Sequence, residues 1–165
     1  MRTARSTGPS GPDAPGDQGF LLIRASPAGA TFVWETASGR QCWAAVNGAL
    51  VSELACTNEP VPVKSPAGIT DLGTLFPDDG WMRLFAADHQ LVVGANCGGR
   101  PVEVLRAGTA AGGARTLYAV WFPDYTKGAI GLRLSRAGTV SEDRLALGDA
   151  GESSCDPAPA PAPAA

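Results

Sequence analysis

The sequence has little positive charge and no long apolar run. Only 2 of its 165 residues are Lys, beside 11 Arg, the formal net charge is −3, and the basic residues never cluster. Nucleic acids and anionic membrane surfaces both attract dense positive charge, so we expect neither as a partner. No apolar run approaches the roughly 20 residues that a membrane-spanning helix needs, so we expect no membrane insertion by this chain.

Metal ligands are also scarce. His89 is the single histidine, and the four cysteines, Cys42, Cys56, Cys97 and Cys155, form no CxxC pair. Zinc sites draw on paired ligands at short spacing, so we predict no metal and no cofactor. The even number of cysteines favours two disulfides and an oxidising compartment. Four unpaired buried thiols are the alternative.

Four cysteines permit three disulfide connectivities, and we favour Cys42–Cys56 together with Cys97–Cys155. The first pair would close a loop of about 15 residues and stabilise the fold by about 3 kcal/mol in the chain-entropy model. The second pair would pin the end of the last strand region to the sheet. This explains why a cysteine stands directly before a Pro/Ala-rich tail.

The two ends of the chain differ in composition from the middle. Residues 1–18 predict a disordered stalk, and residues 150–165 predict a flexible Pro/Ala-rich tail that carries Cys155. Residues 19–149 contain nearly all the large apolar side chains and are long enough for one core. No apolar stretch of signal-peptide kind follows Met1, so export would need a signal or anchor outside the sequence given.

The middle of the chain consists of short β-rich runs separated by turn residues. These runs predict an all-β fold, an antiparallel β-sandwich of two sheets in one domain. One stretch has helical spacing instead, at Ile69, Leu72, Leu75 and Phe76, although Gly73 within it disfavours a helix. The predicted strands cover residues 19–24, 30–36, 41–46, 49–55, 81–87, 90–97, 101–106, 115–122, 129–135 and 143–147.

The strongest turn signal is Asn47-Gly48, because both residues tolerate the positive φ of a type I′ turn. A two-residue turn at this position would set Cys42 opposite Glu53. A disulfide from Cys42 to Cys56 then requires a bulge or strand bend between Glu53 and Cys56.

Three runs in the second half, Trp81–Val93, Tyr118–Pro123 and Ala129–Gly138, have strand patterns joined by turn glycines. In these runs the chain resembles the Ig-like extracytoplasmic modules of actinobacterial membrane-anchored and secreted proteins, including anti-sigma-factor-like ectodomains. The excess of Arg over Lys and the many Ala are typical of GC-rich coding in such bacteria. The resemblance implies an extracytoplasmic β-sandwich used for binding or sensing. The family pattern usually includes a transmembrane segment, which this sequence lacks, and residues 1–56 lie outside the similarity.

No residue pattern points to catalysis. His89 follows Asp88 in a predicted hairpin turn, and no Gly-x-Ser-x-Gly elbow accompanies them. Asp78-Asp79 lies in an ordinary Pro-Asp-Asp-Gly turn, and the glycines of residues 108–113 lack the Gly-Lys-Ser/Thr ending of a phosphate loop. The sequence therefore predicts no catalytic residues.

Aromatic residues of the first strands are the first candidate binding group. If residues 37–40 form a four-residue loop, Trp34 faces Trp43 across the strands and Phe32 lies on the same side, opposite Ala45. Such an aromatic face is half of the core if it is buried. If it is exposed, it is a binding surface.

A second candidate is the connection between two predicted strands at residues 122–128. It places Phe122, Tyr125 and Lys127 in a segment that should be exposed, and binding residues favour loops on rigid scaffolds. Phe122 ending a strand is the alternative.

Taken together, the sequence predicts a non-catalytic extracytoplasmic binding module, secreted or on the cell surface, that binds a protein or a cell-envelope polymer. It would act as a sensor ectodomain or as an adaptor in a surface assembly. Two alternatives belong to other classes. One is a small secreted enzyme or enzyme inhibitor with an unrecognised site, and the other is a cytoplasmic interaction domain.

Overall fold

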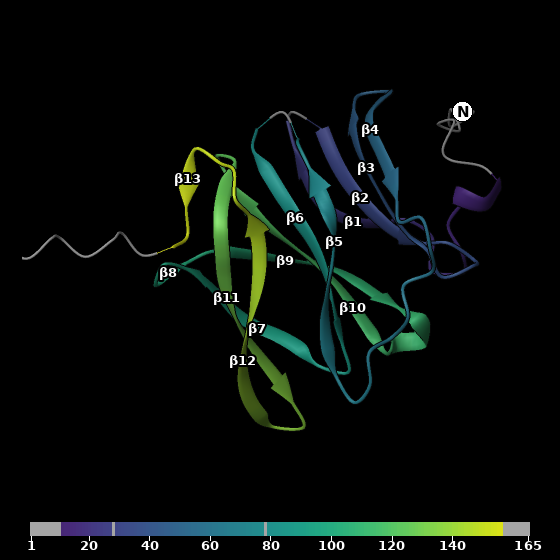
Figure 1. Ribbon diagram of the computed structural model, residues 1–165. Helices are drawn as coiled ribbons and strands as arrows, with labels where there is room; N and C mark the ends of the chain where they lie inside the picture. The colour runs from purple at the N-terminus through teal and green to yellow at the C-terminus, as the bar shows by residue number, and fades with distance from the viewer. Residues whose placement is uncertain (1–10, 28, 78, 157–165) are drawn as a thin grey trace, which may run out of the picture.

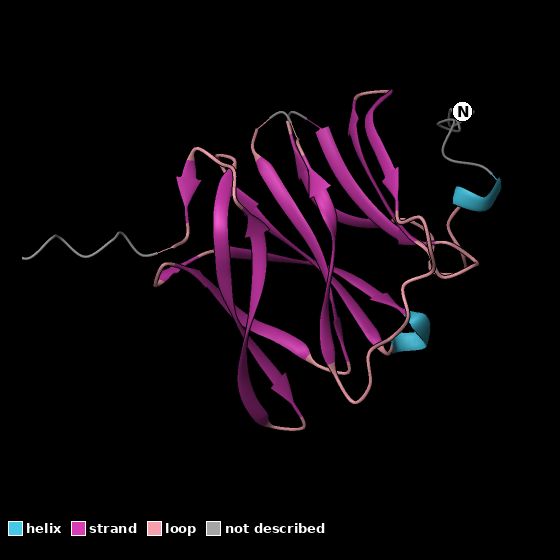
Figure 2. Cartoon of the chain, viewed as in Figure 1, coloured by secondary structure: helices cyan, strands magenta, loops and turns pink. Residues whose placement is uncertain are grey.

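A computed structural model describes residues 11–27, 29–77 and 79–156, which form antiparallel sheets stacked in three layers (Figures 1 and 2). Among the described residues, no helix is long and apolar enough to cross a membrane. The elements are η1 Gly11–Asp13, β1 Leu21–Ser26, β2 Gly29–Glu35, β3 Gln41–Asn47, β4 Leu50–Cys56, β5 Gly68–Leu75, β6 Trp81–Asp88, β7 Leu91–Cys97, β8 Arg100–Pro101, β9 Glu103–Ala110, η2 Ala111–Gly113, β10 Arg115–Phe122, β11 Thr126–Arg136, β12 Thr139–Gly148 and β13 Ser153–Ser154.

Each layer of the stack is one sheet. The N-terminal sheet has the order β1-β2-β3-β4, the central sheet β5-β6-β10-β9, and the C-terminal sheet β12-β11-β7-β8. Figure 1 shows the N-terminal sheet on the right, the central sheet in the middle and the C-terminal sheet on the left. The short strand β13 pairs in parallel with the start of β11.

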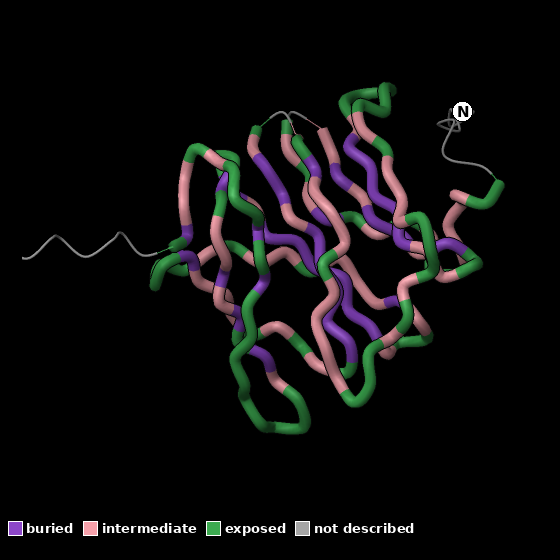
Figure 3. Tube along the Cα trace, viewed as in Figure 1, coloured by how far each residue is buried: buried purple, intermediate pink, exposed green. Residues whose placement is uncertain are grey.

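The central sheet is covered on both faces, so its inner strands are mainly apolar and their few polar side chains lie toward the strand ends or are paired. In β6 and β10 all but one residue of each strand is buried (Figure 3). Toward the C-terminal sheet it presents a core rich in aromatic rings, with Phe85 stacked on Tyr118 at 5.5 Å. Toward the N-terminal sheet its side chains are smaller and include Met82, Leu84 and Ala119.

The structure confirms the all-β sandwich class but has three sheets where we predicted two. The N-terminal meander forms a sheet of its own and packs on the far side of the central sheet. Sequence periodicity does not reveal this arrangement, because a run of buried positions does not tell which two layers cover a strand.

The stretch with helical spacing at Ile69, Leu72, Leu75 and Phe76 does not form a helix, because Gly68–Leu75 is the edge strand β5. A bulge between Asp71 and Gly73 adds one residue to the strand. An inserted residue turns the strand period of two into a local spacing of three, which resembles a helix in the sequence. Gly73 also lets Trp43 of the N-terminal sheet pack on the backbone, since a Cβ there would lie closer than 3.0 Å to the indole ring.

Both favoured disulfides, Cys42–Cys56 and Cys97–Cys155, are present. The expected bulge lies elsewhere, however. Asn47 pairs with Leu50, so the turn is centred on Gly48 and its neighbour rather than on Asn47-Gly48, and Gly48 has a φ of 61°. A bulge between Val51 and Glu53, earlier in β4 than predicted, then sets Cys42 directly opposite Cys56.

The chain ends lie partly outside the described residues. Of the predicted stalk, residues 1–10 are not described, but from residue 11 onward the chain lies against the N-terminal sheet, where Pro15 forms a β-bridge with Thr36. Of the predicted tail, residues 157–165 are not described. The part before them includes β13 and Cys155, which is tied to β7.

Candidate functional site

The predicted pairing of Trp34 with Trp43 is wrong by one residue. Val33 pairs with Trp43 and Trp34 pairs with Cys42, because the hairpin loop has three residues, with Gly39 at a φ of 86°, rather than four. A shift of one residue moves every side chain of a strand to the other face. The two tryptophans therefore lie on opposite faces of the N-terminal sheet, and the shared aromatic face does not exist.

Both tryptophans are buried. Trp43 packs in the core between the N-terminal and central sheets. Trp34 lies on the opposite, outer face, where its Nε1 donates a hydrogen bond to the carbonyl of Asp13 (2.8 Å) and its ring contacts Phe20 edge-on at 4.9 Å. Neither indole is available as a free stacking platform.

The residues of the predicted loop at 122–128 are distributed over different environments. Phe122 is buried beside Trp81, 5.4 Å between ring centroids. Tyr125 is 39% exposed, with its ring edge-on to Trp81 at 5.2 Å. Lys127 is exposed and already belongs to β11, where it pairs with β13. Tyr125 and Lys127 remain at the surface, whereas Phe122 is part of the core.

The outer face of the N-terminal sheet, which faces away from the central sheet, is apolar throughout. Strand pairing arranges its side chains in three rows across the sheet. We name them the covered row, the middle row and the distal row. The covered row is Trp34, Cys42 and Cys56; the middle row is Leu22, Phe32, Ala44 and Leu54; the distal row is Ala25, Ala30, Val46 and Val51.

The chain itself covers the first of these rows and shields part of the second. Phe20 packs edge-on against Trp34 and Phe32, and the segment around Asp13 lies over the Cys42–Cys56 disulfide. An ion pair between Asp13 and Arg40 holds this segment in place. Within the middle row Ala44 is buried between its neighbours, but Leu22 and Leu54 at its two ends are 49% and 47% exposed, and the distal row remains open.

The charged side chains of the N-terminal sheet point the other way, toward the central sheet. Glu35 accepts hydrogen bonds from the backbone N–H of Ala111 and from Gln41, and Glu53 accepts one from the backbone N–H of Phe76. Charged groups are normally placed on the solvent side of a two-layer packing. Here the solvent side is the apolar one, which is what we would expect of a surface that is covered by something else.

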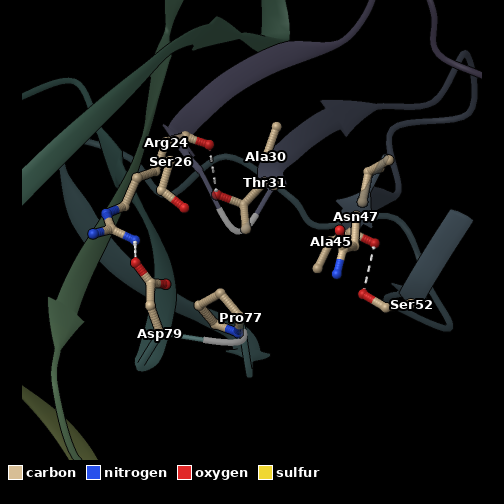
Figure 4. Close-up of a pocket in the computed structure, with 11 residues that line it drawn as sticks. Arg24, Ser26, Ala30, Thr31, Ala45, Asn47, Ser52, Pro77 and Asp79 are labelled. Atoms are coloured by element: carbon tan, nitrogen blue, oxygen red, sulfur yellow. Dashed lines mark hydrogen bonds and ion pairs between the residues drawn. The ribbon is translucent and has the colours of Figure 1, made fainter. Parts of the chain in front are cut away.

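The pocket at the upper rim of the same sheet is too small for a ligand. Arg24 reaches across it to Asp79 with an ion pair of 2.6 Å, and Ser52 donates to the carbonyl of Ala45 (Figure 4). The enclosed volume is about 20 Å³. This is room for about one water molecule, so the rim connects the layers rather than binding a substrate.

The outer face of the C-terminal sheet is built differently. One row across it is Gly94, Arg133 and Glu142, and the next begins with Asn96 and ends with Arg144. Charged and amide groups thus stand between exposed apolar residues, as on an ordinary protein surface.

Two clusters that could suggest chemistry have structural roles. Asp13 lies near Cys42 and Cys56 in a group that resembles a set of metal ligands, but the two sulfurs are bonded to each other and are not thiolates. Asp88 and Arg115 form a fully buried ion pair of 2.7 Å.

The buried ion pair fixes the segment that connects the N-terminal and central sheets. Arg115 donates to the carbonyls of Val61 and Pro62, and Asp88 accepts from the backbone N–H of Lys64. Burial raises the pKa of the Asp88 carboxyl, but the hydrogen bonds from Arg115 and Lys64 and the Arg115 charge outweigh it. The pKa therefore lies below its ordinary value of 3.8.

Sequence reasoning missed the apolar outer face, although a signal for it exists. The alternation expected of a strand with one solvated face is absent in Cys42–Val46, and exposed Leu and Val residues follow in β4.

Comparisons of the chain with protein-family models, curated proteins and solved structures find no match.

Proposed function

We propose that this chain is a non-catalytic extracytoplasmic interaction module, a sensor ectodomain or an adaptor, that binds a protein through the outer face of the N-terminal sheet. The observation that carries the proposal is the open part of this face. Its middle and distal rows contain only apolar side chains, yet Leu22, Val51 and Leu54 are 47% to 49% exposed. Exposed apolar patches of this kind mark interaction sites.

A protein fits this face better than a cell-envelope polymer. Sugar polymers present many hydroxyl groups, which lose hydrogen bonds to water when they are covered by apolar atoms. The middle and distal rows offer no side-chain donor or acceptor to replace those bonds. Apolar side chains of a partner protein have no such cost and gain from burial.

The placement outside the cytoplasm is supported by the two disulfides, because such bonds form and persist in oxidising compartments. The resemblance of residues 81–138 to Ig-like extracytoplasmic modules agrees with it. The non-catalytic character is supported by how the acidic groups are used, since Asp88 is neutralised by Arg115 and Asp79 by Arg24.

Site-specific photo-crosslinking in the producing cell tests the binding surface. A photoreactive residue at position 54 should form a protease-sensitive adduct with a protein. The same residue at Val140, which is 52% exposed on β12, should not. Adducts that resist protease and yield to polymer-degrading enzymes would contradict a protein partner, and equal labelling at both positions would contradict the choice of face.

The compartment has its own test in the intact mass of natively produced protein. Two disulfides make the mass rise by about four hydrogens on reduction. An unchanged mass would mean four free thiols and would remove the argument for export.

A further inference from the structure

The open part of the outer face needs an occupant that the described chain does not supply. Residues 11–20 reach the covered row and, through Phe20, the edge of Phe32 in the middle row, but not Leu54 or the distal row. In the sequence, residues 1–10 contain a single large apolar residue, Met1, and residues 157–165 contain only Pro and Ala. Neither segment has the side chains to cover two rows that cross four strands.

We propose that the occupant is a second copy of this chain, packed face to face with the first about a two-fold axis. This inference rests on the proposed function, because it names the partner of the same face. The axis runs parallel to the strands and lies between β2 and β3. Stacked sheets of this kind lie about 10 Å apart with their strands inclined by about 30°.

The two open rows are complementary to themselves in the sizes of their side chains. A two-fold axis between β2 and β3 places β1 on β4 of the other copy and β2 on its β3, and it keeps each row opposite the same row. In the middle row, Phe32 then lies over Ala44 of the second copy, and Leu22 lies over its Leu54. A large ring over a small side chain fills a hollow without overpacking.

The distal row follows the same pattern. Its side chains in strand order are Ala25, Ala30, Val46 and Val51. The two-fold axis reverses that order on the second copy, so each alanine meets a valine and each valine meets an alanine. A face that evolved to bind an unrelated partner has no reason to have this inverse order of sizes.

The charge of the chain also favours this face as a contact between two copies. Each copy has a formal net charge of −3, so two copies repel when they meet through charged surfaces. The middle and distal rows contain no charged side chain. This face is therefore a surface on which two copies can meet without placing like charges opposite each other.

The face is small for a protein–protein interface. Four strands about 4.8 Å apart and about four residues of about 3.4 Å each, the span of the two open rows, give a flat area of about 260 Å² per copy. The total of about 520 Å² is well below the about 1,200 Å² of stable complexes, so the dimer is weak and depends on concentration. Association would become significant where many copies are concentrated at one surface or assembly.

Sedimentation velocity of the purified 165-residue chain with both disulfides formed tests the inference. We expect a reversible monomer–dimer equilibrium when the chain concentration is varied from about 5 to 500 μM, because small interfaces of this class form weak, transient complexes. Leu22→Lys and Leu54→Glu should each weaken the dimer by at least about tenfold, because each buries a charge opposite an apolar side chain. Both residues are half exposed, so the monomer fold tolerates these changes.

The double variant Leu22→Lys/Leu54→Glu makes the test specific to the geometry. It places the introduced ammonium group of each copy opposite the introduced carboxylate of the other. Dimerisation should therefore recover to within about threefold of the wild-type constant and become sensitive to salt. Val140→Glu, the matched change on the C-terminal sheet, should leave the dimer unchanged.

Three results would overturn the inference: a wild-type chain that stays monomeric over the whole range, a double variant no better than the single ones, or equal weakening by Val140→Glu. The failure of this inference is distinguishable from failure of the proposed function. If position 54 crosslinks to a protein of another mass while the purified chain stays monomeric, the face is a binding surface for a different protein. If position 54 forms no protein adduct, the proposed function itself is wrong.

Discussion

The N-terminal and C-terminal sheets cover opposite faces of the same central sheet, but they are attached to it in different ways. The C-terminal sheet packs on a core with Trp81, Phe85 and Tyr118, and the Cys97–Cys155 disulfide closes a segment of sequence separation 58. The N-terminal sheet packs on smaller side chains, and its disulfide links two neighbouring strands at a separation of 14.

The outer faces of the two flanking sheets also differ in polarity. The C-terminal sheet has Arg133, Glu142 and Arg144 toward solvent, whereas the open rows of the N-terminal sheet are apolar. Among the described residues, the C-terminal sheet therefore has the outer face of an ordinary protein surface, whereas the N-terminal sheet leaves apolar side chains exposed. Matched positions on the two sides allow this difference to be tested.

The largest expected effect comes from breaking the ion pair that holds the connection to the N-terminal sheet. Arg115→Ala leaves Asp88 buried without its partner and frees the carbonyls of Val61 and Pro62. We expect a loss of about 3–5 kcal/mol in the free energy of unfolding, measured by urea denaturation.

Arg83→Ala is the control, because its ion pair with Asp71 is partly exposed. Exposed pairs contribute about 0–1 kcal/mol. A similar loss for the two variants would show that the buried pair has no special role in joining the layers.

The same pair makes stability depend on pH. The pKa of folded Asp88 lies below its ordinary value of 3.8, so the unfolded chain takes up the proton first. The stabilisation is complete above the unfolded pKa of about 4 and is lost as the pH falls through the folded pKa. Urea titrations at neutral and acidic pH should therefore show a steeper acid loss in the wild type than in Asp88→Asn, and parallel curves would contradict this assignment.

Loss of the Cys97–Cys155 disulfide, which holds the C-terminal sheet, should destabilise the fold more than loss of the Cys42–Cys56 disulfide within the N-terminal sheet. Replacing Cys97 and Cys155 with Ser removes a constraint worth about 4 kcal/mol in the chain-entropy model, against about 3 kcal/mol for Cys42 and Cys56. Thermal unfolding of the two double variants measures the difference. A greater loss from the Cys42/Cys56 variant would mean that the N-terminal sheet depends on its local bridge more than loop length implies.

Sequence patterns were sufficient for elements whose signals are local. Alternation and turn glycines predicted the all-β class and most strands, and both cysteine pairings followed from chain positions. Sequence patterns failed where a single inserted or deleted residue decides the element type or the strand register. The bulge before Gly73 imitated a helix, and a hairpin loop of three rather than four residues put Trp34 and Trp43 on opposite faces.

The lost alternation in Cys42–Val46 indicates that this strand is apolar on both sides, but it does not show which of its neighbours are exposed. An exposed Leu54 and a buried Leu84 look alike in the sequence until the strand pairing is known. The same is true of the third sheet, since burial on both faces depends on which layers meet.

Replacing a glycine with alanine at one position in the central sheet and one in the C-terminal sheet should change the free energy of unfolding by smaller amounts than the variants above. Gly73→Ala puts a Cβ closer than 3.0 Å to the Trp43 ring, so we expect a loss of about 1–3 kcal/mol from overpacking. At Gly94 on the C-terminal sheet the nearest atom to a new Cβ is Cδ of Arg133 at 3.9 Å, so Gly94→Ala should be neutral or stabilising by up to about 1 kcal/mol. Chemical denaturation of both variants checks the pair, and equal losses would mean that Trp43 does not rest on Gly73.

The smallest effect on stability is expected at the two outer faces themselves. Leu54→Ser and Val140→Ser should each change the unfolding free energy of the dilute monomer by less than about 0.5 kcal/mol, because both side chains are about half exposed. Only Leu54→Ser should reduce the fluorescence of a dye that binds apolar surfaces. A marked loss of stability from Leu54→Ser would identify the face as part of the fold rather than as a contact surface.

The burial of the central sheet on both faces also limits how its sequence can vary. A strand with one solvated face has every second position free to accept polar substitutions, and drift accumulates there. Strand β10 has no such positions, because seven of its eight residues, Arg115–Val120 and Phe122, are buried. We therefore expect substitutions to be tolerated in the two flanking sheets and in the edge strands β5 and β9, where a new outer face can arise without altering β6 and β10 beneath it.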